Sequence, residues 1–379
     1  MSHSYRQCSG VMFASLLLFS GALQASGSGQ EVNTEYEDTT LVEITGGLEH
    51  PWGLAILPDG RYLVTERKGR LLLVDGGDTT TISGTPEVKA VNQGGLLDVV
   101  LHPEYEDNGW IYLTYSKPEN ADDTRLAMGR ARLDGDRLSE WEVLFEQDRA
   151  SSAGRHYGAR MAWMNDGTLL LTVGDRGEDE KNRPQHLDDH AGSVLRLTAT
   201  GAAAEGNPFA GQEGALPEIY SYGHRNIQGI IVHPDTGEIW VTEHGPRGGD
   251  ELNLIEAGNN YGWPEVSLGR DYRSEEQFGE RSNGDMTGPV YEFLPTLAPS
   301  GLALVSGDTY PAWQGNLLAG GLRAERVLRV VLEEQEVVHL EELLLKTVGR
   351  IRDVREGPDG HIYVLNDEED AGLFRLEPR

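Results

Sequence analysis

The sequence predicts an all-β fold, a six-bladed β-propeller with four-stranded antiparallel blades. One hairpin unit recurs six times along the chain, and apolar residues occur in short runs rather than at the 3.6-residue period of long helices. The 48 glycines and 17 prolines supply the turns that such a fold needs. Because no linker or break in composition divides the chain, residues 27–379 are expected to form a single domain.

Each repeated unit is a tight turn followed by a short apolar strand. The turn glycines lie 45 to 78 residues apart, at Gly60, Gly109, Gly167, Gly237, Gly315 and Gly360. Asp-Gly and Asn-Gly pairs allow the positive φ of tight hairpins, so each unit is expected to join two adjacent antiparallel strands. The gaps leave room for four strands and loops of varied length, whereas a β-sandwich with irregular hairpins would not explain a repeat over the whole chain.

Polar pairs follow three of the predicted strands, at Glu66-Arg67, Asp175-Arg176 and Glu243-His244. If the turn begins the same strand in every blade, these pairs lie at one common end of the propeller. The functional residues are therefore expected where the loops of that end meet the central channel.

The N-terminus has the features of a cleaved secretory signal peptide over residues 1–26. Arg6 precedes an apolar stretch from Val11 to Phe19, and small residues follow as far as Ala25. The only cysteine, Cys8, precedes the apolar stretch, so it fits neither a lipid anchor nor a disulfide. These features predict a periplasmic or secreted bacterial protein with no membrane insertion after cleavage; an uncleaved anchor is the alternative.

The charge balance excludes two classes of partner. With 62 acidic and 32 basic residues, the formal net charge is −30, which repels nucleic acid and anionic membrane surfaces. An anionic cofactor would need a local basic pocket. No phosphate loop, zinc-binding histidine pair or nucleophile elbow is present.

The most informative segment is residues 243–253, EHGPRGGDELN, followed by NYGWP at residues 260–264. A Gly-Pro-x-Gly-Gly run cannot continue a strand, and it turns backbone carbonyls outward beside two carboxylates. Such oxygens suit a hard cation such as Ca²⁺, although a solvated glycine loop would also explain the run.

These two motifs resemble the calcium segment of the soluble pyrroloquinoline quinone (PQQ)-dependent aldose sugar dehydrogenases, within the glucose/sorbosone dehydrogenase family. The resemblance implies a calcium ion on Gly245 and Pro246 that also binds the quinone, and a second calcium on Glu251 and the backbone of Tyr261. It also implies a cofactor-binding role for His244.

Further motifs of that family follow in order along nearly all of the chain, from NQGGLLD at residues 92–98 to GRIRD at residues 349–353. The resemblance implies catalytic roles for His156, Asp175 and Arg225. It implies cofactor contacts from Gln93, His156, Arg225, Asn226, Arg350 and Arg352.

The residue types agree with these implied roles. Guanidinium groups suit the carboxylates of a tricarboxylic quinone, and Arg350 and Arg352 share one strand face because strand side chains alternate with period two. Ordinary surface ion pairs are the alternative for either arginine alone. A neutral imidazole can accept the proton of a sugar's anomeric hydroxyl, which would make His156 the base and Asp175 its orienting carboxylate. Without the resemblance, His156 would rank no higher than His186, His190 or His224.

The sequence departs from the family pattern in two places. Where relatives have a lysine over the quinone, this chain has Arg323, which is also cationic but bulkier and planar, and the resemblance implies a cofactor contact from it. Where glucose-oxidising relatives have a tryptophan before a Pro-Thr-x-Ala-Pro-Ser run, this chain has Leu294, which weakens the case for glucose as the preferred sugar.

The resemblance therefore implies PQQ- and calcium-dependent oxidation of aldoses to lactones by hydride transfer to the quinone, with electrons passed to an external acceptor. Two other functions stay open from the residues alone. A calcium-dependent lactonase would need carboxylate and asparagine side chains around a central metal, and a non-catalytic propeller would bind a partner protein.

Overall fold

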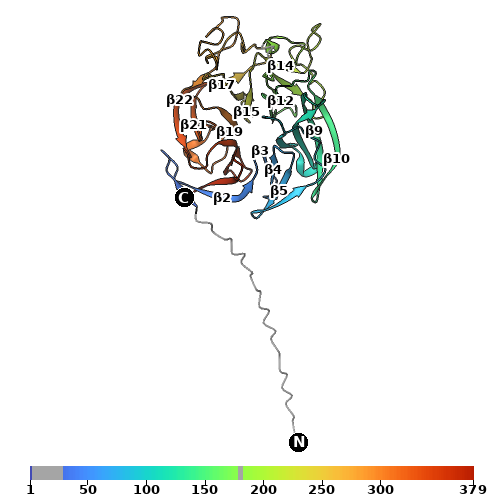
Figure 1. The fold of residues 1–379 in the computed structure, drawn as a ribbon. Coiled ribbons are helices and arrows are strands. Elements are labelled where there is room, and N and C mark those ends of the chain that lie inside the picture. Colours follow the sequence, from blue (N-terminus) through green and yellow to red (C-terminus); the bar gives the residue numbers. More distant parts are fainter. Residues whose placement is uncertain (2–28, 178–181) are drawn as a thin grey trace.

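A computed structural model of the chain describes residues 1, 29–177 and 182–379. It contains six antiparallel sheets arranged around a central axis (Figure 1), which confirms the predicted propeller. The predicted signal peptide lies, except for Met1, outside the described residues. Among the described residues, no helix has the length and apolar character needed to cross a membrane.

The blades are numbered here in chain order, each from its innermost to its outermost strand. Blade 1 comprises β3 (Pro51–Ile56), β4 (Tyr62–Glu66), β5 (Leu71–Asp75) and β6 (Asp78–Ile82), and blade 2 comprises β7 (Leu96–Leu101), β8 (Trp110–Pro118), β9 (Thr124–Asp134) and β10 (Arg137–Glu146). Blade 3 comprises β11 (Gly158–Trp163), β12 (Leu169–Val173), β13 (Ser193–Leu197) and β14 (Ile219–Tyr222), and blade 4 comprises β15 (Ile227–Val232), β16 (Ile239–Glu243), β17 (Asp250–Ile255) and β18 (Tyr291–Phe293).

Blade 5 comprises β19 (Pro299–Leu304), β20 (Leu317–Gly321), β21 (Arg326–Glu333) and β22 (Glu336–Leu343). Blade 6 comprises β23 (Ile351–Glu356), β24 (Ile362–Asn366), β25 (Ala371–Pro378), β2 (Thr39–Leu48) and β1 (Gln30–Val32). The described helical turns are short: α1 (Tyr105–Asn108) and the 3₁₀ turns η1 (Arg183–Gln185) and η2 (Pro311–Trp313).

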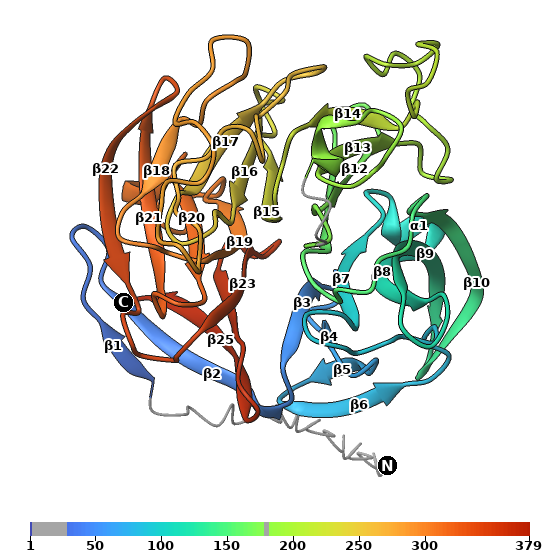
Figure 2. The same ribbon diagram turned by 45° about the horizontal axis from the view of Figure 1, so that its top comes forward.

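The six predicted hairpin turns join the first and second strands of the six blades. Each of their glycines has a positive φ, from 67° at Gly109 to 88° at Gly60, which explains the glycine at these positions. The first strands lie next to the central axis, as Figure 2 shows for β3, β7, β15, β19 and β23. All six first strands therefore begin on the same side of the propeller, and the second strands finish on that side.

Blade 6 differs from the prediction because both termini contribute to it. Strand β2, from the N-terminal region, pairs with β25 at the C-terminus, with Thr39 opposite Pro378, and β1 adds a fifth strand. This pairing closes the ring of blades. It has no local turn signal, because its two strands come from opposite ends of the chain.

The core lies between blades. Every residue of β4 and β16 is buried, whereas the outermost strand β6 is buried only at Ile82. One apolar cluster joins blades 2 and 3 through residues such as Tyr112 and Leu171. Since each fully buried aliphatic or aromatic side chain contributes about 1.5–3 kcal/mol, packing between blades fixes their relative positions.

Candidate active site

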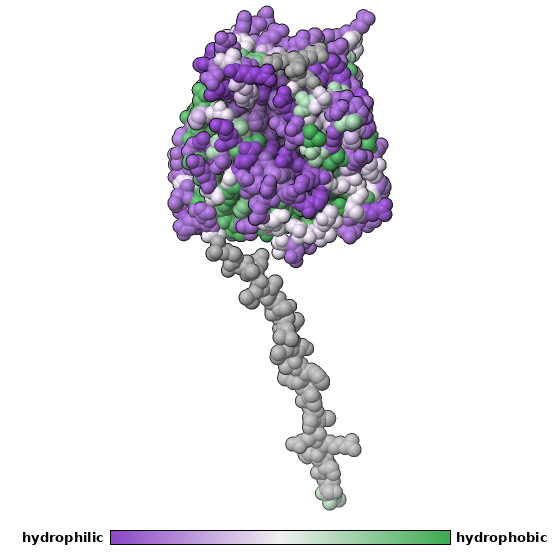
Figure 3. All heavy atoms as spheres, in the orientation of Figure 1, coloured by the Kyte–Doolittle hydropathy of each residue, from purple (hydrophilic) through white to green (hydrophobic). Residues whose placement is uncertain are grey.

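A cavity of about 570 Å³ lies at the end of the propeller where the innermost strands begin. Figure 3 shows one face of the molecule, on which hydrophilic residues predominate and surround the hollowed centre. The cavity wall includes seven residues for which the sequence implied a catalytic or cofactor-binding role: Gln93, His156, Arg225, Asn226, His244, Arg350 and Arg352. The remaining residues of the wall are His50, Trp52, Arg67, Gln228, Tyr272, Ala298, Leu322, Asp367, Glu368 and Glu369.

His156 and Asp175 form a hydrogen-bonded pair at this cavity. The Nδ1 atom of His156 lies 2.6 Å from Oδ1 of Asp175, and 13% of the histidine side chain stays exposed. Asp175 also accepts hydrogen bonds from Trp263 Nε1 at 2.8 Å and from the backbone N–H of Gly177 at 2.7 Å. Burial alone would raise the pKa of Asp175, but the charges of His156 and Arg225 and these hydrogen bonds lower it to about 2.

The surroundings of His156 favour the neutral form of its imidazole. Burial lowers the pKa of His156, and the nearby charge of Arg225 lowers it further, against the opposite effect of Asp175. Because Asp175 accepts the Nδ1 proton, Nε2 carries a lone pair that can act as an acceptor, and the donor Nη2 of Arg225 lies 3.5 Å from it. This arrangement can accept a proton at Nε2.

The backbone of His156 is constrained as well. Its φ of 50° is in the left-handed region, which costs a non-glycine residue about 1 kcal/mol. Its N–H donates to Oε1 of Gln93 at 2.8 Å, and its carbonyl accepts from the N–H of Arg176 at 3.3 Å. Gln93 therefore supports the histidine from the neighbouring blade.

Arg225 and Asn226 enter the cavity just before β15. The backbone N–H of Arg225 donates to Glu243, and its Nη1 donates to the carbonyl of His244 at 3.2 Å. Oδ1 of Asn226 accepts from the N–H of Gly158 at 3.1 Å, so Asn226 links blades 3 and 4. The pKa of His244 is well below its usual value because of burial and Arg225, and its Nε2 is buried without a hydrogen-bond partner.

Arg350 and Arg352 reach the same cavity from the start of β23, as the period of the strand predicts. Arg352 donates from Nη2 to Asp367 at 2.6 Å and from Nη1 to Gln228 at 3.0 Å. Arg350 is more open, because 43% of its side chain is exposed and its Nη2 lies 3.6 Å from Asp367. Burial would raise the pKa of Asp367, but Arg352 holds it far below its usual range.

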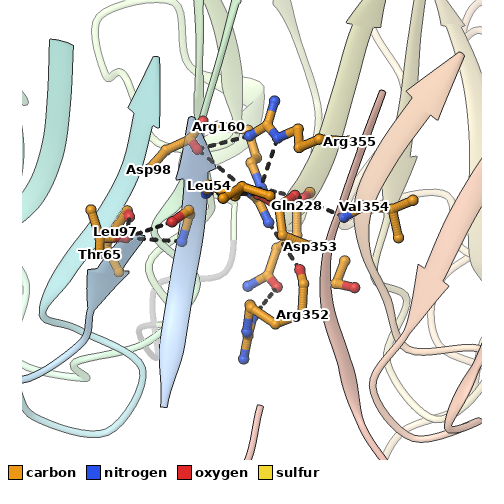
Figure 4. Close-up of polar contacts among 12 residues, drawn as sticks. Leu54, Thr65, Leu97, Asp98, Arg160, Gln228, Arg352, Asp353, Val354 and Arg355 are labelled. Atoms are coloured by element: carbon orange, nitrogen blue, oxygen red, sulfur yellow. Dashed lines mark hydrogen bonds and ion pairs between the residues drawn. The ribbon is translucent and has the colours of Figure 1, made fainter. Parts of the chain in front are cut away.

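A buried ion network lies between the innermost strands, next to Arg352 (Figure 4). Arg160 on β11 lies 3.2 Å from Asp98 on β7 and 3.0 Å from Asp353 on β23. Arg355 contacts the same two carboxylates at 2.9 and 3.0 Å. Nη2 of Arg160 also donates to the backbone carbonyl of Arg352 at 3.0 Å, so the network supports the cavity wall at Arg352.

The predicted calcium segment borders a second, much smaller cavity. Its wall contains Gly245, Glu251 and Tyr261 together with Glu243, whereas Pro246 is buried beside it. Glu243 and Glu251 are opposite each other on β16 and β17. Burial and the charge of Glu243 raise the pKa of Glu251 to about 8.

These residues fit a calcium ion in the chemistry of their donors. A cation would relieve the repulsion between the two carboxylates, and oxygen donors are those that Ca²⁺ prefers. Among the described residues, no group of three or more His, Cys, Asp or Glu side chains is arranged for a metal. Backbone carbonyls would therefore have to supply much of the coordination.

Arg323 lies apart from the other marked residues. It is exposed in the turn after β20, and its neighbour Leu322 lines the cavity instead.

No role was predicted for several residues of this site, among them Trp52, Trp263 and Asp367, and Arg67 was expected only as part of the polar pair that follows its strand. Asp367 directly follows β24, so the rule that marked the ends of β4, β12 and β16 would have found it if applied to blade 6.

Comparisons with known proteins agree with this architecture. The sequence pattern described as Glucose / Sorbosone dehydrogenase matches residues 48–375. Aldose sugar dehydrogenase YliI of Escherichia coli strain K12 is 38% identical over 340 residues, which cover 88% of this chain and 91% of that protein.

Two solved structures have a similar fold. The soluble aldose sugar dehydrogenase of Escherichia coli in its apo form superposes with a TM-score of 0.86 at 35% identity, covering 90% of this chain and 100% of that chain. The PQQ-bound aldose sugar dehydrogenase of Streptomyces coelicolor superposes with a TM-score of 0.74 at 28% identity, covering 90% and 98%. Since the family pattern spans most of the sequence, this chain belongs to the glucose/sorbosone dehydrogenase family.

Proposed function

We propose that this protein oxidises the anomeric hydroxyl of aldose sugars to lactones, in the periplasm or outside the cell, and passes the electrons to an external acceptor. The observation that carries the proposal is the His156–Asp175 pair at 2.6 Å, placed beside Arg225 in a cavity lined by arginines. Relatives in the same family are named as aldose sugar dehydrogenases, and one of them is a PQQ-bound structure.

His156 is the base in this proposal. Its Nε2 accepts the hydroxyl proton, while Asp175 stays ionised, keeps the Nδ1 proton in place and stabilises the imidazolium that forms. Positioned bases of this kind contribute about 10²- to 10⁴-fold to a rate. Arg225 donates hydrogen bonds toward negative charge that develops on an oxygen beside Nε2.

The cavity wall would hold the cofactor. Bound PQQ would supply a two-electron acceptor for the hydride of the anomeric carbon, and Ca²⁺ a Lewis acid. The residues proposed to contact PQQ are Gln93, His156, Arg225, Asn226, His244, Arg350 and Arg352. The residues proposed to hold calcium are Gly245 and Pro246 beside the cofactor, and Glu251 and Tyr261 in the smaller cavity.

A reconstitution assay tests the proposal. The purified apoprotein is mixed with a panel of aldoses and a reducible dye, with and without added PQQ and Ca²⁺. We expect sugar-dependent dye reduction only when both are present. A protein that neither reduces dye nor shifts the PQQ spectrum would contradict the proposal, and lactone hydrolysis without quinone would favour the lactonase.

Two histidine variants locate the base. His156→Gln should lower turnover about 10²- to 10⁴-fold, whereas PQQ should still bind through its remaining contacts. The matched control is His186→Gln, because His186 is exposed and does not line the cavity. Equal activity of the two variants would remove the assignment.

A further inference from the structure

Arg67 has a fixed position at the cavity and no role in the proposal above. It directly follows β4, and its side chain lines the cavity together with Arg350 and Arg352. Its backbone N–H donates to the carbonyl of His50 at 3.2 Å, and its own carbonyl accepts from the N–H of Leu96 at 3.1 Å. The side chain therefore extends from a rigid point between blades 1 and 2.

The guanidinium of Arg67 is only partly satisfied by the protein. Nη1 donates to the carbonyl of Asn92 at 3.0 Å. Nε is buried without a partner, and Nη2 bonds no residue in the described parts of the chain. Within those parts, no carboxylate forms an ion pair with it either. Open donors on a half-buried cation are costly, so such a group is suited to an anionic ligand.

The neighbouring carboxylates are engaged elsewhere. Asp367 accepts from Arg352 through Oδ2 and lies 3.1 Å from Nδ1 of His50 through Oδ1. Oε1 of Glu368 lies 3.3 Å from the backbone N–H of Arg350. Burial lowers the pKa of Arg67, and Arg352 and Arg350 lower it further, against the attraction of Asp367. A ligand carboxylate would relieve this excess of positive charge.

Arg323 offers no equivalent group at the cavity. It is exposed in the turn that follows β20, and it is not part of the cavity wall. A guanidinium in addition to those of Arg225, Arg350 and Arg352 therefore comes from blade 1 and not from blade 5.

We propose that Arg67 binds a carboxylate group of PQQ, so that three arginines from blades 1 and 6, Arg67, Arg350 and Arg352, hold the anionic cofactor. This inference rests on the proposed function, since it assigns a binding residue to the same cofactor. Arg67 supplies hydrogen bonds and charge to the ligand and takes no part in proton transfer.

The test is a titration of PQQ into the apoprotein with Ca²⁺ present, followed by the quenching of tryptophan fluorescence. Arg67→Gln should weaken PQQ binding about 10- to 100-fold, as expected for loss of a hydrogen bond between charged groups. Arg67→Lys, which keeps the charge but not the planar fork, should lose less. Arg323→Gln and the control Lys68→Gln should each change the affinity less than twofold; Lys68 is an exposed neighbour that pairs with Glu49.

A purely structural role gives a different result. If Arg67 only anchors the segment at Asn92, Arg67→Gln lowers kcat at saturating PQQ and leaves the affinity unchanged, and this outcome overturns the inference. A larger loss in Arg323→Gln than in Arg67→Gln also overturns it. Wild-type protein that fails to bind PQQ refutes the proposed function itself, whereas normal binding by both wild type and Arg67→Gln refutes only the role of Arg67.

Discussion

Asp98 is the residue whose replacement should most clearly destabilise the centre of the propeller. Its side chain is fully buried, and Oδ1 lies 3.2 Å from Arg160 and 2.9 Å from Arg355. Oδ2 accepts from the backbone N–H of Met161 at 2.9 Å. With Asp353, these groups form a network of two cations and two anions, so their charges balance.

The substitution Asp98→Asn removes one negative charge at almost constant volume. Arg160 and Arg355 then share the single negative charge of Asp353, so the network keeps one uncompensated positive charge beside the fully buried Arg160. Removing one partner of a buried ion pair costs about 3–5 kcal/mol. The amide NH₂ also has to face a donor, either Met161 N–H or an arginine, which adds to the loss. We therefore expect the free energy of unfolding to fall by about 3–5 kcal/mol.

Equilibrium unfolding in urea, followed by tryptophan fluorescence, measures this loss. The matched control is Glu146→Gln, because Glu146 pairs with Lys117 on the surface and should cost at most about 1 kcal/mol. Adding Arg355→Met to Asp98→Asn restores the charge balance, so the double variant should be more stable than the single one. If it is not, or if Asp98→Asn unfolds like the control, the reasoning from charge balance is refuted.

Three further outcomes follow from buried groups. Burial lowers the pKa of His190, but its hydrogen bond to Asp148 raises it above the usual value. The pair of His190 and Asp148 therefore stabilises the fold fully at low pH, and this contribution is lost as the pH rises above about 6.5. The urea midpoint of wild type should fall over that pH range more than that of His190→Asn. Trp263→Phe removes the 2.8 Å hydrogen bond to Asp175, so kcat should fall about 10-fold with PQQ affinity unchanged, and an unchanged kcat would contradict this. Because burial and the charge of Glu243 raise the pKa of Glu251 to about 8, Ca²⁺ should raise the melting temperature of wild type more than that of Glu251→Gln, which keeps the site at Gly245 and Pro246; equal rises would exclude this carboxylate as a ligand.

The blades were predictable from the sequence because their signals are local. Each first hairpin is specified by a turn of a few residues, and all six glycines, including Gly60 and Gly360, adopt the expected positive φ. The closure of the ring was not predictable in this way. Strands β2 and β25 pair across more than 300 residues of chain, and no turn links them.

The same distinction applies to the site. The sequence indicated His156 and Asp175 through motifs. His156 precedes β11 and Asp175 follows β12, and the structure places Nδ1 of His156 2.6 Å from Oδ1 of Asp175. The sequence indicated Arg67 only as a polar residue that follows a strand, and its position beside Asp367 depends on the convergence of blades 1 and 6 at the cavity. No sequence pattern in β4 or β24 indicates which residues of the other strand's blade lie next to it.

A protein of net charge −30 can still hold an anion because screening makes the local arrangement decisive. At physiological ionic strength the Debye length is about 8 Å, so most surface carboxylates have little influence inside the cavity. The ion network next to Arg352 is neutral, since Arg160 and Arg355 pair with Asp98 and Asp353. The potential at the cavity therefore depends on its own wall, where the inner strands begin. Four arginines reach that wall from three blades and outnumber its three carboxylates, Asp367, Glu368 and Glu369, so an acidic protein has a pocket with an excess of positive charge.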